Sequence, residues 1–306
     1  MELKYNFPKA IDNTMRTAWD ACQRKFLLSH IYNLRSQDPS IHLVFGGAYA
    51  KGLEVARLEY YGGNTNKMDY LGKAFIAAIQ EWHLHLDDPL IDEKKSLLTC
   101  LCAIDWYFKE FPMGSDWLAP VALPNGKPAI EFTFAIPLRL KLLDEFVLYT
   151  GRFDMLVDYA SEPAVYDDKT TVQLGNQWIK SWSLSSQLTG YIWAAQQSGF
   201  KTNTAIVRGE SILTASFGNA QAIEHRTKWQ IASWYDVLHH NLEGMLKAFN
   251  EGEDAFLPSY GQACHAYGGC PYQSLCKKEN WKDWIEPEFH YYLWDPLAVH
   301  KTEKQP

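Results

Sequence analysis

Three consecutive strand-like segments in the middle of the chain constrain its fold more than any other feature. Residues 129–140 alternate between apolar and other side chains, as strands with one buried face do. Residues 145–159 and 164–171 are also strand-like, and the turn-forming Ser161-Glu-Pro lies between them. The short connection predicts that these segments form a three-strand meander.

Helical periodicity occupies most of the remaining chain. Apolar side chains recur at helical spacing, for example at Trp19, Cys22 and Phe26. The expected helices are residues 14–35, 45–61, 69–86, 92–111, 176–198 and 228–249, and a further short strand is expected at 202–208. Helices, then a meander, then helix and strand predict an α/β fold.

Composition excludes several classes of protein. Of the 306 residues, 47% are hydrophobic and 21% charged, which is typical of a soluble globular protein. No apolar stretch approaches the ~18 uncharged residues of a membrane span, and the N-terminal MELKYNFPKAIDN lacks the apolar core of a signal peptide. We therefore expect a cytoplasmic protein without a membrane partner. The net charge of −7 leaves nucleic-acid binding open, because an acidic total can hide a local basic groove.

The meander carries an unusual set of charged residues. Gly151-Arg-Phe-Asp154 lies on its second strand, and Asp167 and Lys169 lie on its third. Because side chains two apart in a strand share a face, Asp167 and Lys169 point the same way and Asp168 points away. Asp154 can then sit beside Asp167 across the hairpin.

Two close carboxylates repel each other unless a proton or a cation lies between them. Mg²⁺ or Mn²⁺ suits oxygen ligands and keeps waters for chemistry. Such an ion could activate a water and stabilise charge on a phosphate, while Lys169 orients the water or neutralises that charge. Glu131, on the preceding strand, could supply another carboxylate. The alternative is a surface hairpin with a Lys–Asp pair.

Gln187 and Tyr191 follow on the long predicted helix. They are four residues apart and therefore share one helix face. In this position they could contact a substrate phosphate or base. Alternatively, they form an ordinary half-buried helix face.

Three motifs in this order resemble those of the PD-(D/E)xK nuclease superfamily: Gly151-Arg-Phe-Asp154, Tyr166-Asp-Asp-Lys-Thr-Thr171 and Gln187-Leu-Thr-Gly-Tyr191. In detail the set is similar to the RecB-like branch, which includes CRISPR-associated RecB-like exonucleases and related phage enzymes. The resemblance runs from about residue 14 to 276. It implies a restriction-endonuclease-like core, which is a mixed central sheet flanked by helices, with an N-terminal helical lobe and a C-terminal cysteine-rich segment. We expect one nuclease-like domain over residues 1–306, with a helical part at 14–120, the core at 128–250 and the cysteine-rich segment at 261–280.

The resemblance also implies residue roles. Residues that match Asp154 and Asp167 bind the metal, the one that matches Lys169 is catalytic, and the Gln–Tyr motif lies close to the active site. The implied activity is metal-dependent cleavage of DNA, most simply by an exonuclease that acts on single strands or DNA ends. Recombination, repair or phage DNA processing is the implied setting, with DNA and recombination proteins as partners in a bacterial or phage-infected cell.

One position departs from the family pattern. The family's first motif reads F-G-x-x-x-H before a helix, and its His is a metal ligand. Here Phe45-Gly-Gly-Ala-Tyr-Ala50 fits the frame, but Ala50 takes the His position. A water or a nearby Glu could substitute. The alternative function is a catalytically impaired nuclease fold that binds DNA or acts as a scaffold. Candidate DNA contacts, chosen by charge alone, are Arg152, Lys180 and Arg208.

Cysteines form a second motif. Cys264, Cys270 and Cys276 are evenly spaced in a Gly-rich segment, and Cys22 lies far upstream. Cytosolic cysteines at such spacing more often bind metal than form disulfides. In the RecB-like branch, one N-terminal and three C-terminal cysteines hold a [4Fe–4S] cluster, and these four positions match. Tetrahedral Zn²⁺, with His265 as a spare ligand, and plain reduced thiols remain alternatives.

Overall fold

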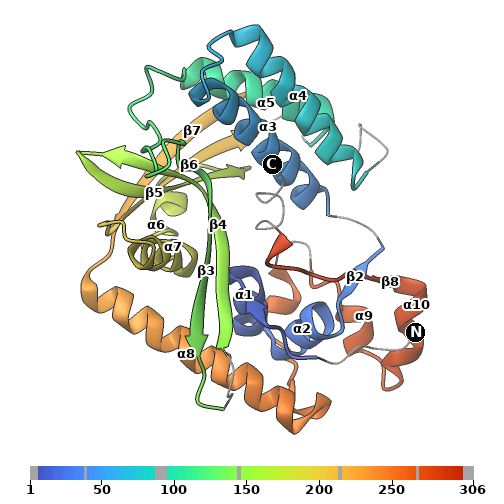
Figure 1. Cartoon of the computed structure of the whole chain (residues 1–306). Coiled ribbons are helices and arrows are strands. Elements are labelled where there is room, and N and C mark those ends of the chain that lie inside the picture. The colour runs from blue at the N-terminus through green and yellow to red at the C-terminus, as the bar shows by residue number, and fades with distance from the viewer. Residues whose placement is uncertain are drawn as a thin grey trace. The chain divides into compact units, whose positions relative to one another are not determined.

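The computed structural model describes residues 6–37, 40–86, 95–142, 146–212, 216–266 and 269–298 (Figure 1). Its helices are α1 (Asn13–Ala21), α2 (Gln23–Phe26), α3 (Ile41–Tyr61), α4 (Lys67–His83), α5 (Leu97–Glu110), α6 (Asn176–Lys180), α7 (Ser186–Gln197), α8 (Lys228–Glu251), α9 (Gln273–Cys276) and α10 (Ile285–Glu288). Its strands are β1 (Ala10–Ile11), β2 (Leu34–Ser36), β3 (Ile130–Arg139), β4 (Phe146–Tyr159), β5 (Glu162–Thr171), β6 (Thr204–Ile212), β7 (Phe217–His225) and β8 (Phe289–Tyr291). Within these residues, no helix has the length and apolar character needed to cross a membrane.

A mixed sheet forms the centre of the fold. Its strand order is β1-β4-β5-β6-β7, and β3 also pairs with β4. The β4–β5 and β6–β7 pairs are antiparallel, whereas β1–β4 and β5–β6 are parallel. The predicted α/β class, a mixed central sheet flanked by helices, is confirmed.

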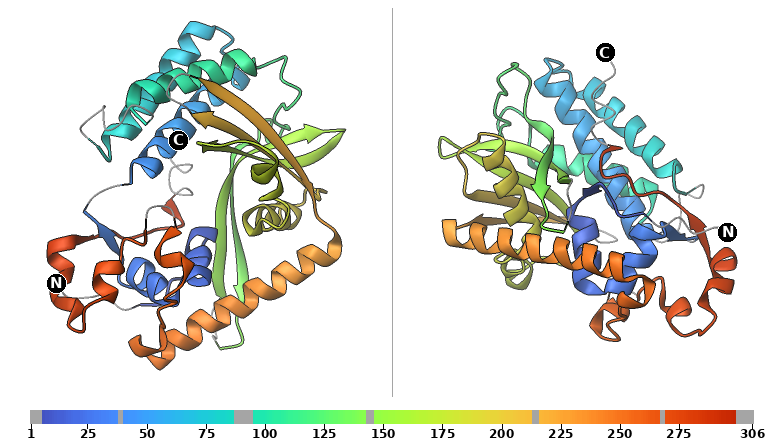
Figure 2. Two further views of the ribbon diagram at one scale, coloured as in Figure 1. Left: turned by 180° about the vertical axis from the view of Figure 1, so that it is seen from behind. Right: turned by 60° about the horizontal axis from the view of Figure 1, so that its bottom comes forward.

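Chain contacts divide the protein into two compact units, and residues 39–132 and 152–230 form one of them. In this unit, α3, α4 and α5 lie on one side of β5 and β6, and α6 and α7 lie on the other (Figures 1 and 2). Apolar residues of the three long helices, among them Phe45, Trp82 and Phe108, form one buried cluster. The sheet therefore has a helical layer on both faces here.

The other unit comprises the described residues of 1–38, 133–151 and 231–306. The side chain of Asp12 caps α1 by accepting a hydrogen bond from the Met15 amide at 2.8 Å. Its second oxygen accepts a bond from the Trp294 indole at 2.8 Å. Strand β2 pairs with β8 in antiparallel register. The first and last parts of the chain are thus held together within this unit.

Several predicted elements differ from the structure. The helix expected at 14–35 is broken at Cys22, whose backbone is extended, and α2 continues into a π-helical turn (Leu27–Ile31). Asn33 then adopts a left-handed φ of 55°, which cannot continue a helix. The helix expected at 176–198 is two helices, because Ser185 caps a new start at α7.

Strand boundaries also differ. The strand expected at 202–208 extends to Ile212, because β7 pairs with it along its length. No prediction covered β7, since its sequence FGNAQAIEH is rich in small and polar residues that do not read as a strand. The predicted starts Asp92 and Glu145 lie outside the described residues.

Candidate active site

The β4–β5 hairpin positions the predicted acidic residues. Its turn is formed by Ala160 and Ser161, both with positive φ, and the side chain of Asp158 accepts a hydrogen bond from the Ser161 amide. From this turn the ladder runs back to the pair Met155↔Tyr166. Just beyond it, Asp154 accepts a hydrogen bond of 2.6 Å from the Asp168 amide. Because the β4–β5 pairing ends here, the Asp168 amide is available to bond the Asp154 carboxylate.

Asp167 and Lys169 form an ion pair on the same strand, as their spacing predicts. The Asp167 side chain is buried, whereas that of Lys169 is 31% exposed. Burial opposes the charged form of Lys169, but the Asp167 and Asp154 carboxylates raise its pKa above the usual value. Lys169 is therefore a charged group at the edge of a carboxylate cluster.

The carboxylates destabilise one another. Burial, followed by repulsion from Asp167 and Asp168, raises the pKa of Asp154 to about 7. Burial and then Asp154 raise the pKa of Glu131 to about 8, although Arg152 pairs with Glu131 at 2.7 Å. The φ of Glu131 is 51°, a strained value for this residue type in a strand. The charged forms of these carboxylates are thus disfavoured by burial and by one another, and a bound cation would stabilise them.

The carboxylate oxygens of Asp154, Asp167 and Glu131 are the kind of ligand that Mg²⁺ or Mn²⁺ prefers. Within the residues that the structure describes, however, no three His, Cys, Asp or Glu side chains converge closely enough to hold an ion as they stand. Asp154, Asp167 and Glu131 would have to move closer together to hold an ion.

Helix α3 carries the position where the family has a His. Ala50 is exposed there, and Glu54 lies one turn further on the same helix face. Glu54 is paired with Lys51 at 2.8 Å, and its charge adds to the raised pKa of Glu131. Glu54 therefore lies close to the carboxylate cluster, and Ala50 contributes no ligand.

Gln187 and Tyr191 are in contact on α7. The Gln187 amide donates a hydrogen bond of 2.9 Å to the Tyr191 hydroxyl. The ring of Tyr191 packs against the ring of Phe153, and the two ring centroids are 5.5 Å apart. Phe153 is the residue that precedes Asp154 on β4. The Gln–Tyr pair thus lies against the strand that carries the first predicted ligand.

A buried polar network behind β5 was missed by the sequence analysis. The Arg57 guanidinium, from α3, pairs with Asp168 at 2.7 Å, and both side chains are almost fully buried. Arg57 also donates to the Tyr107 hydroxyl at 2.7 Å. Tyr107 and Tyr166 bond at 2.9 Å, and Tyr166 donates to Asp168 at 2.6 Å, which closes a ring. The ring holds the residue whose amide binds Asp154.

The three candidate DNA contacts lie in different environments. Arg208 is 1% exposed, pairs with Asp116 at 2.7 Å and lies over the ring of Phe111. Its charge is compensated inside the fold, so Arg208 lacks the exposed cationic group that a phosphate contact would use. Lys180 is exposed at the end of α6, and Arg152 is 41% exposed beside Glu131.

The four matching cysteines are free and half-buried. Cys22 lies between α1 and α2, Cys264 in a 3₁₀ turn (Gln262–Cys264), and Cys276 at the end of α9. The Cys270 amide donates to the Cys264 carbonyl at 2.9 Å. Burial raises the pKa of Cys270, and the neighbouring Cys22 and Cys264 add to that rise.

Burial also raises the pKa of Cys276, with contributions from Cys22 and Cys270. These interactions bring the four thiols into one neighbourhood, although in the part of the chain that the structure describes they do not converge closely enough to hold an ion as they stand. Four sulfur donors without a disulfide suit an iron–sulfur cluster or Zn²⁺ by their chemistry. Cys100 is buried in α5 and Cys102 is exposed, and neither belongs to this group.

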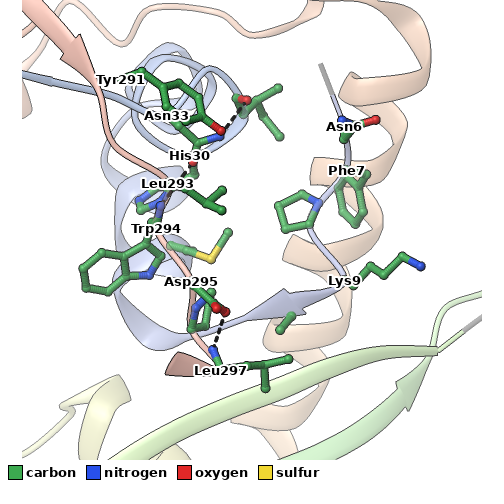
Figure 3. A pocket seen from close by; sticks show the side chains of 15 residues that line it. Asn6, Phe7, Lys9, His30, Asn33, Tyr291, Leu293, Trp294, Asp295 and Leu297 are labelled. Carbon is green, nitrogen blue, oxygen red and sulfur yellow. Dashed lines mark hydrogen bonds between the residues drawn. The ribbon is translucent and has the colours of Figure 1, made fainter. Parts of the chain in front are cut away.

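The unit that carries the cysteines also has a cavity of about 260 Å³ (Figure 3). His30, Leu293 and Trp294 line it, together with Phe7 and Lys9. None of the residues singled out in the sequence lies in its wall.

Comparison with known proteins gives the family. A search of curated proteins found no match. Among solved structures, a protein from Eubacterium rectale described as a candidate exonuclease is 12% identical, with 79% of this chain and 82% of that chain covered and a TM-score of 0.44. The structure of SSO0001 is 11% identical, with 73% and 82% covered and a TM-score of 0.29. A sequence model of the PD-(D/E)XK nuclease superfamily matches residues 17–277, nearly the whole chain. The chain therefore belongs to the PD-(D/E)XK nuclease superfamily.

Proposed function

We propose that this protein is a metal-dependent DNA nuclease of the RecB-like branch that acts on single strands or DNA ends. The observation that carries the proposal is the carboxylate cluster of Asp154, Asp167 and Glu131 beside the charged Lys169. Burial and then repulsion between the carboxylates raise the pKa values of Asp154 and Glu131, and a divalent cation would stabilise their charged forms. The chain belongs to a superfamily of nucleases, and the matched range includes this cluster.

Asp154, Asp167 and Glu131 would hold Mg²⁺ or Mn²⁺, with Glu54 near them in place of the family's His. The ion, when bound, supplies an activated water and charge stabilisation at the scissile phosphate. Lys169 orients the attacking water and neutralises charge that develops on the phosphate oxygens. The Asp168 amide keeps the Asp154 carboxylate in place through its hydrogen bond of 2.6 Å. The Gln187–Tyr191 pair contacts the substrate beside the hairpin.

Cleavage of end-labelled single-stranded DNA tests the proposal. Wild-type protein should degrade the DNA only with Mg²⁺ or Mn²⁺, and Asp167→Asn should lose at least about 100-fold in rate, since it removes a ligand charge. Glu162→Gln is the matched control, because Glu162 is an exposed acid on the same strand. Moving the label between the 5′ and 3′ ends reads the polarity, and a circular substrate separates exonuclease from endonuclease action.

A second function has one observation in its favour, the Ala50 at the His position. A protein with a weakened site would bind DNA without cutting it. DNA binding by wild type with no cleavage in either metal would support this scaffold function and overturn the enzyme.

We also propose a [4Fe–4S] cluster on Cys22, Cys264, Cys270 and Cys276, with a structural role. Freshly purified protein should be brown, absorb broadly near ~400 nm and contain iron and sulfide. Colourless protein with stoichiometric zinc would replace the cluster with Zn²⁺. Protein with neither metal would leave four reduced thiols.

A further inference from the structure

The chain that follows β5, which carries Asp167 and Lys169, forms a concave surface. A cavity of about 350 Å³ is lined by Gln173, Leu174, Gly175, Asn176, Gln177, Trp178 and Ser181. The three amide residues are exposed, and Trp178 is half-buried. This segment begins two residues after Thr171 of the Lys169-Thr-Thr sequence, so the chain itself joins the cavity to the hairpin.

Trp178 lies on the same face of the sheet as Lys169. The register of β5 and β6 pairs Lys169 with Gly209, and paired residues in neighbouring strands direct their side chains to the same face. A Cβ atom added to Gly209 would come within 2.4 Å of the Trp178 indole. The indole therefore lies against the Gly209 backbone, and the backbone of Gly209 is about one strand spacing, ~4.8 Å, from that of Lys169.

Only glycine permits this contact. Leu174 would also approach an added Cβ, at 2.9 Å, and the φ of Gly209 is not in the left-handed region. The glycine at this position is therefore explained by the close approach of the indole and not by backbone conformation. Trp178 packs against β6, the strand next to β5, and its side chain also forms part of the cavity wall.

The chemistry of this surface suits a nucleobase. An aromatic ring fixed against a sheet offers a stacking platform, which all four bases can use. The amides of Gln173, Asn176 and Gln177 each carry donors and an acceptor, as the edges of bases do. The cavity lacks a cationic side chain, so it fits a base better than a phosphate.

We propose that Trp178 stacks on a nucleobase of single-stranded DNA, with the base edge toward the amides, next to the phosphate that Lys169 serves. This inference rests on the proposed function, since it assumes DNA as the substrate. It assigns a subsite that binds a nucleobase by stacking, whichever base is present. The subsite lies over β6, the strand next to the one that carries Lys169.

The geometry can be tested without DNA. Gly209→Ala should lower the thermal midpoint in wild type, because the methyl group collides with the indole. In a Trp178→Ala background the same substitution should have a markedly smaller effect, since the indole is gone. Equal effects of Gly209→Ala in the two backgrounds would show that the indole does not lie on Gly209, and would overturn the placement.

DNA binding tests the function. Fluorescence anisotropy of labelled oligo(dT) is measured in an Asp167→Asn parent, so that cleavage does not interfere. Trp178→Ala should weaken binding about 5- to 100-fold, and Trp178→Phe should recover part of it, because stacking needs a ring. Trp229→Ala is the matched control, since Trp229 is 75% exposed but lies outside the cavity wall.

Single abasic sites moved along the oligonucleotide complete the test. The parent should lose affinity at one position, and Trp178→Ala should be insensitive at that position, because the base and the ring interact only with each other. If the parent binds DNA and Trp178→Ala binds equally well, the subsite is overturned and the proposed function stands. If the parent binds no DNA, both the subsite and the proposed function are overturned.

Discussion

The buried ion pair between Arg57 and Asp168 makes a prediction that the structure quantifies. Arg57→Met removes one partner of a pair that is 2.7 Å apart, with side chains only 4% and 5% exposed. The Asp168 carboxylate is then left with the Tyr166 hydroxyl as a donor, close to the Asp154 and Asp167 carboxylates. An unpaired buried charge costs about 3–5 kcal/mol, so the free energy of unfolding should fall by that amount.

Urea unfolding followed by circular dichroism measures this loss. Asp168→Asn alone should also destabilise the protein, since it leaves the Arg57 guanidinium without its carboxylate. The double variant should lose less than the sum of the two single losses, by at least about 1.5 kcal/mol, because it leaves no uncompensated charge.

Lys73 offers a matched control. Lys73 pairs with Glu59 at the same distance of 2.7 Å, but its side chain is 46% exposed. Lys73→Met should therefore leave the urea midpoint almost unchanged, since an exposed pair is screened by water. A loss of under 1 kcal/mol for Arg57→Met, or strict additivity with Asp168→Asn, would refute the reasoning.

Three further predictions concern the carboxylates, the cysteines and the helix position without a His. In metal-free protein, the pKa of Asp154 is raised from 3.8 to about 7 and that of Glu131 from 4.5 to about 8. Folding then takes up protons, so the free energy of unfolding should fall as pH rises through this window. Urea titrations in EDTA measure this pH dependence, and Asp154→Asn should make it weaker. A free energy of unfolding that rises with pH would contradict the pKa directions. Cys22→Ser should remove the absorbance near ~400 nm and lower the thermal midpoint, whereas Cys102→Ser should change neither. Ala50→His should tighten Mn²⁺ binding about 10-fold by calorimetry, and unchanged affinity would place Ala50 outside the site.

The elements that the sequence predicted well are those with a local signal. Alternation between Ile130 and Ile136 and the strand-like run before Tyr159 are set by which face each residue buries, and the structure has strands at both. The spacing of Asp167 and Lys169 placed them on one face for the same reason. Gln187 and Tyr191 met because helical geometry alone brings residues four apart together.

What the sequence could not predict depends on contacts distant in the chain. No local pattern marks Arg57 as a partner of Asp168, because only the folded chain brings the two together. Arg208 reads as a phosphate contact, but Asp116 compensates its charge inside the fold. The placement of Trp178 follows from the parallel pairing of β5 with β6, which has no signal in the sequence.

Binding of Mn²⁺ to metal-free protein tests the central claim most directly, because it asks whether the carboxylate cluster is a metal site. Isothermal titration calorimetry is carried out on wild type, Asp154→Asn, Asp167→Asn and the exposed-acid control Glu162→Gln. We predict saturable binding in wild type and Glu162→Gln, and its loss in the two cluster variants, since each removes a negatively charged ligand. Absence of binding in wild type, or equal binding in all four proteins, would contradict the account.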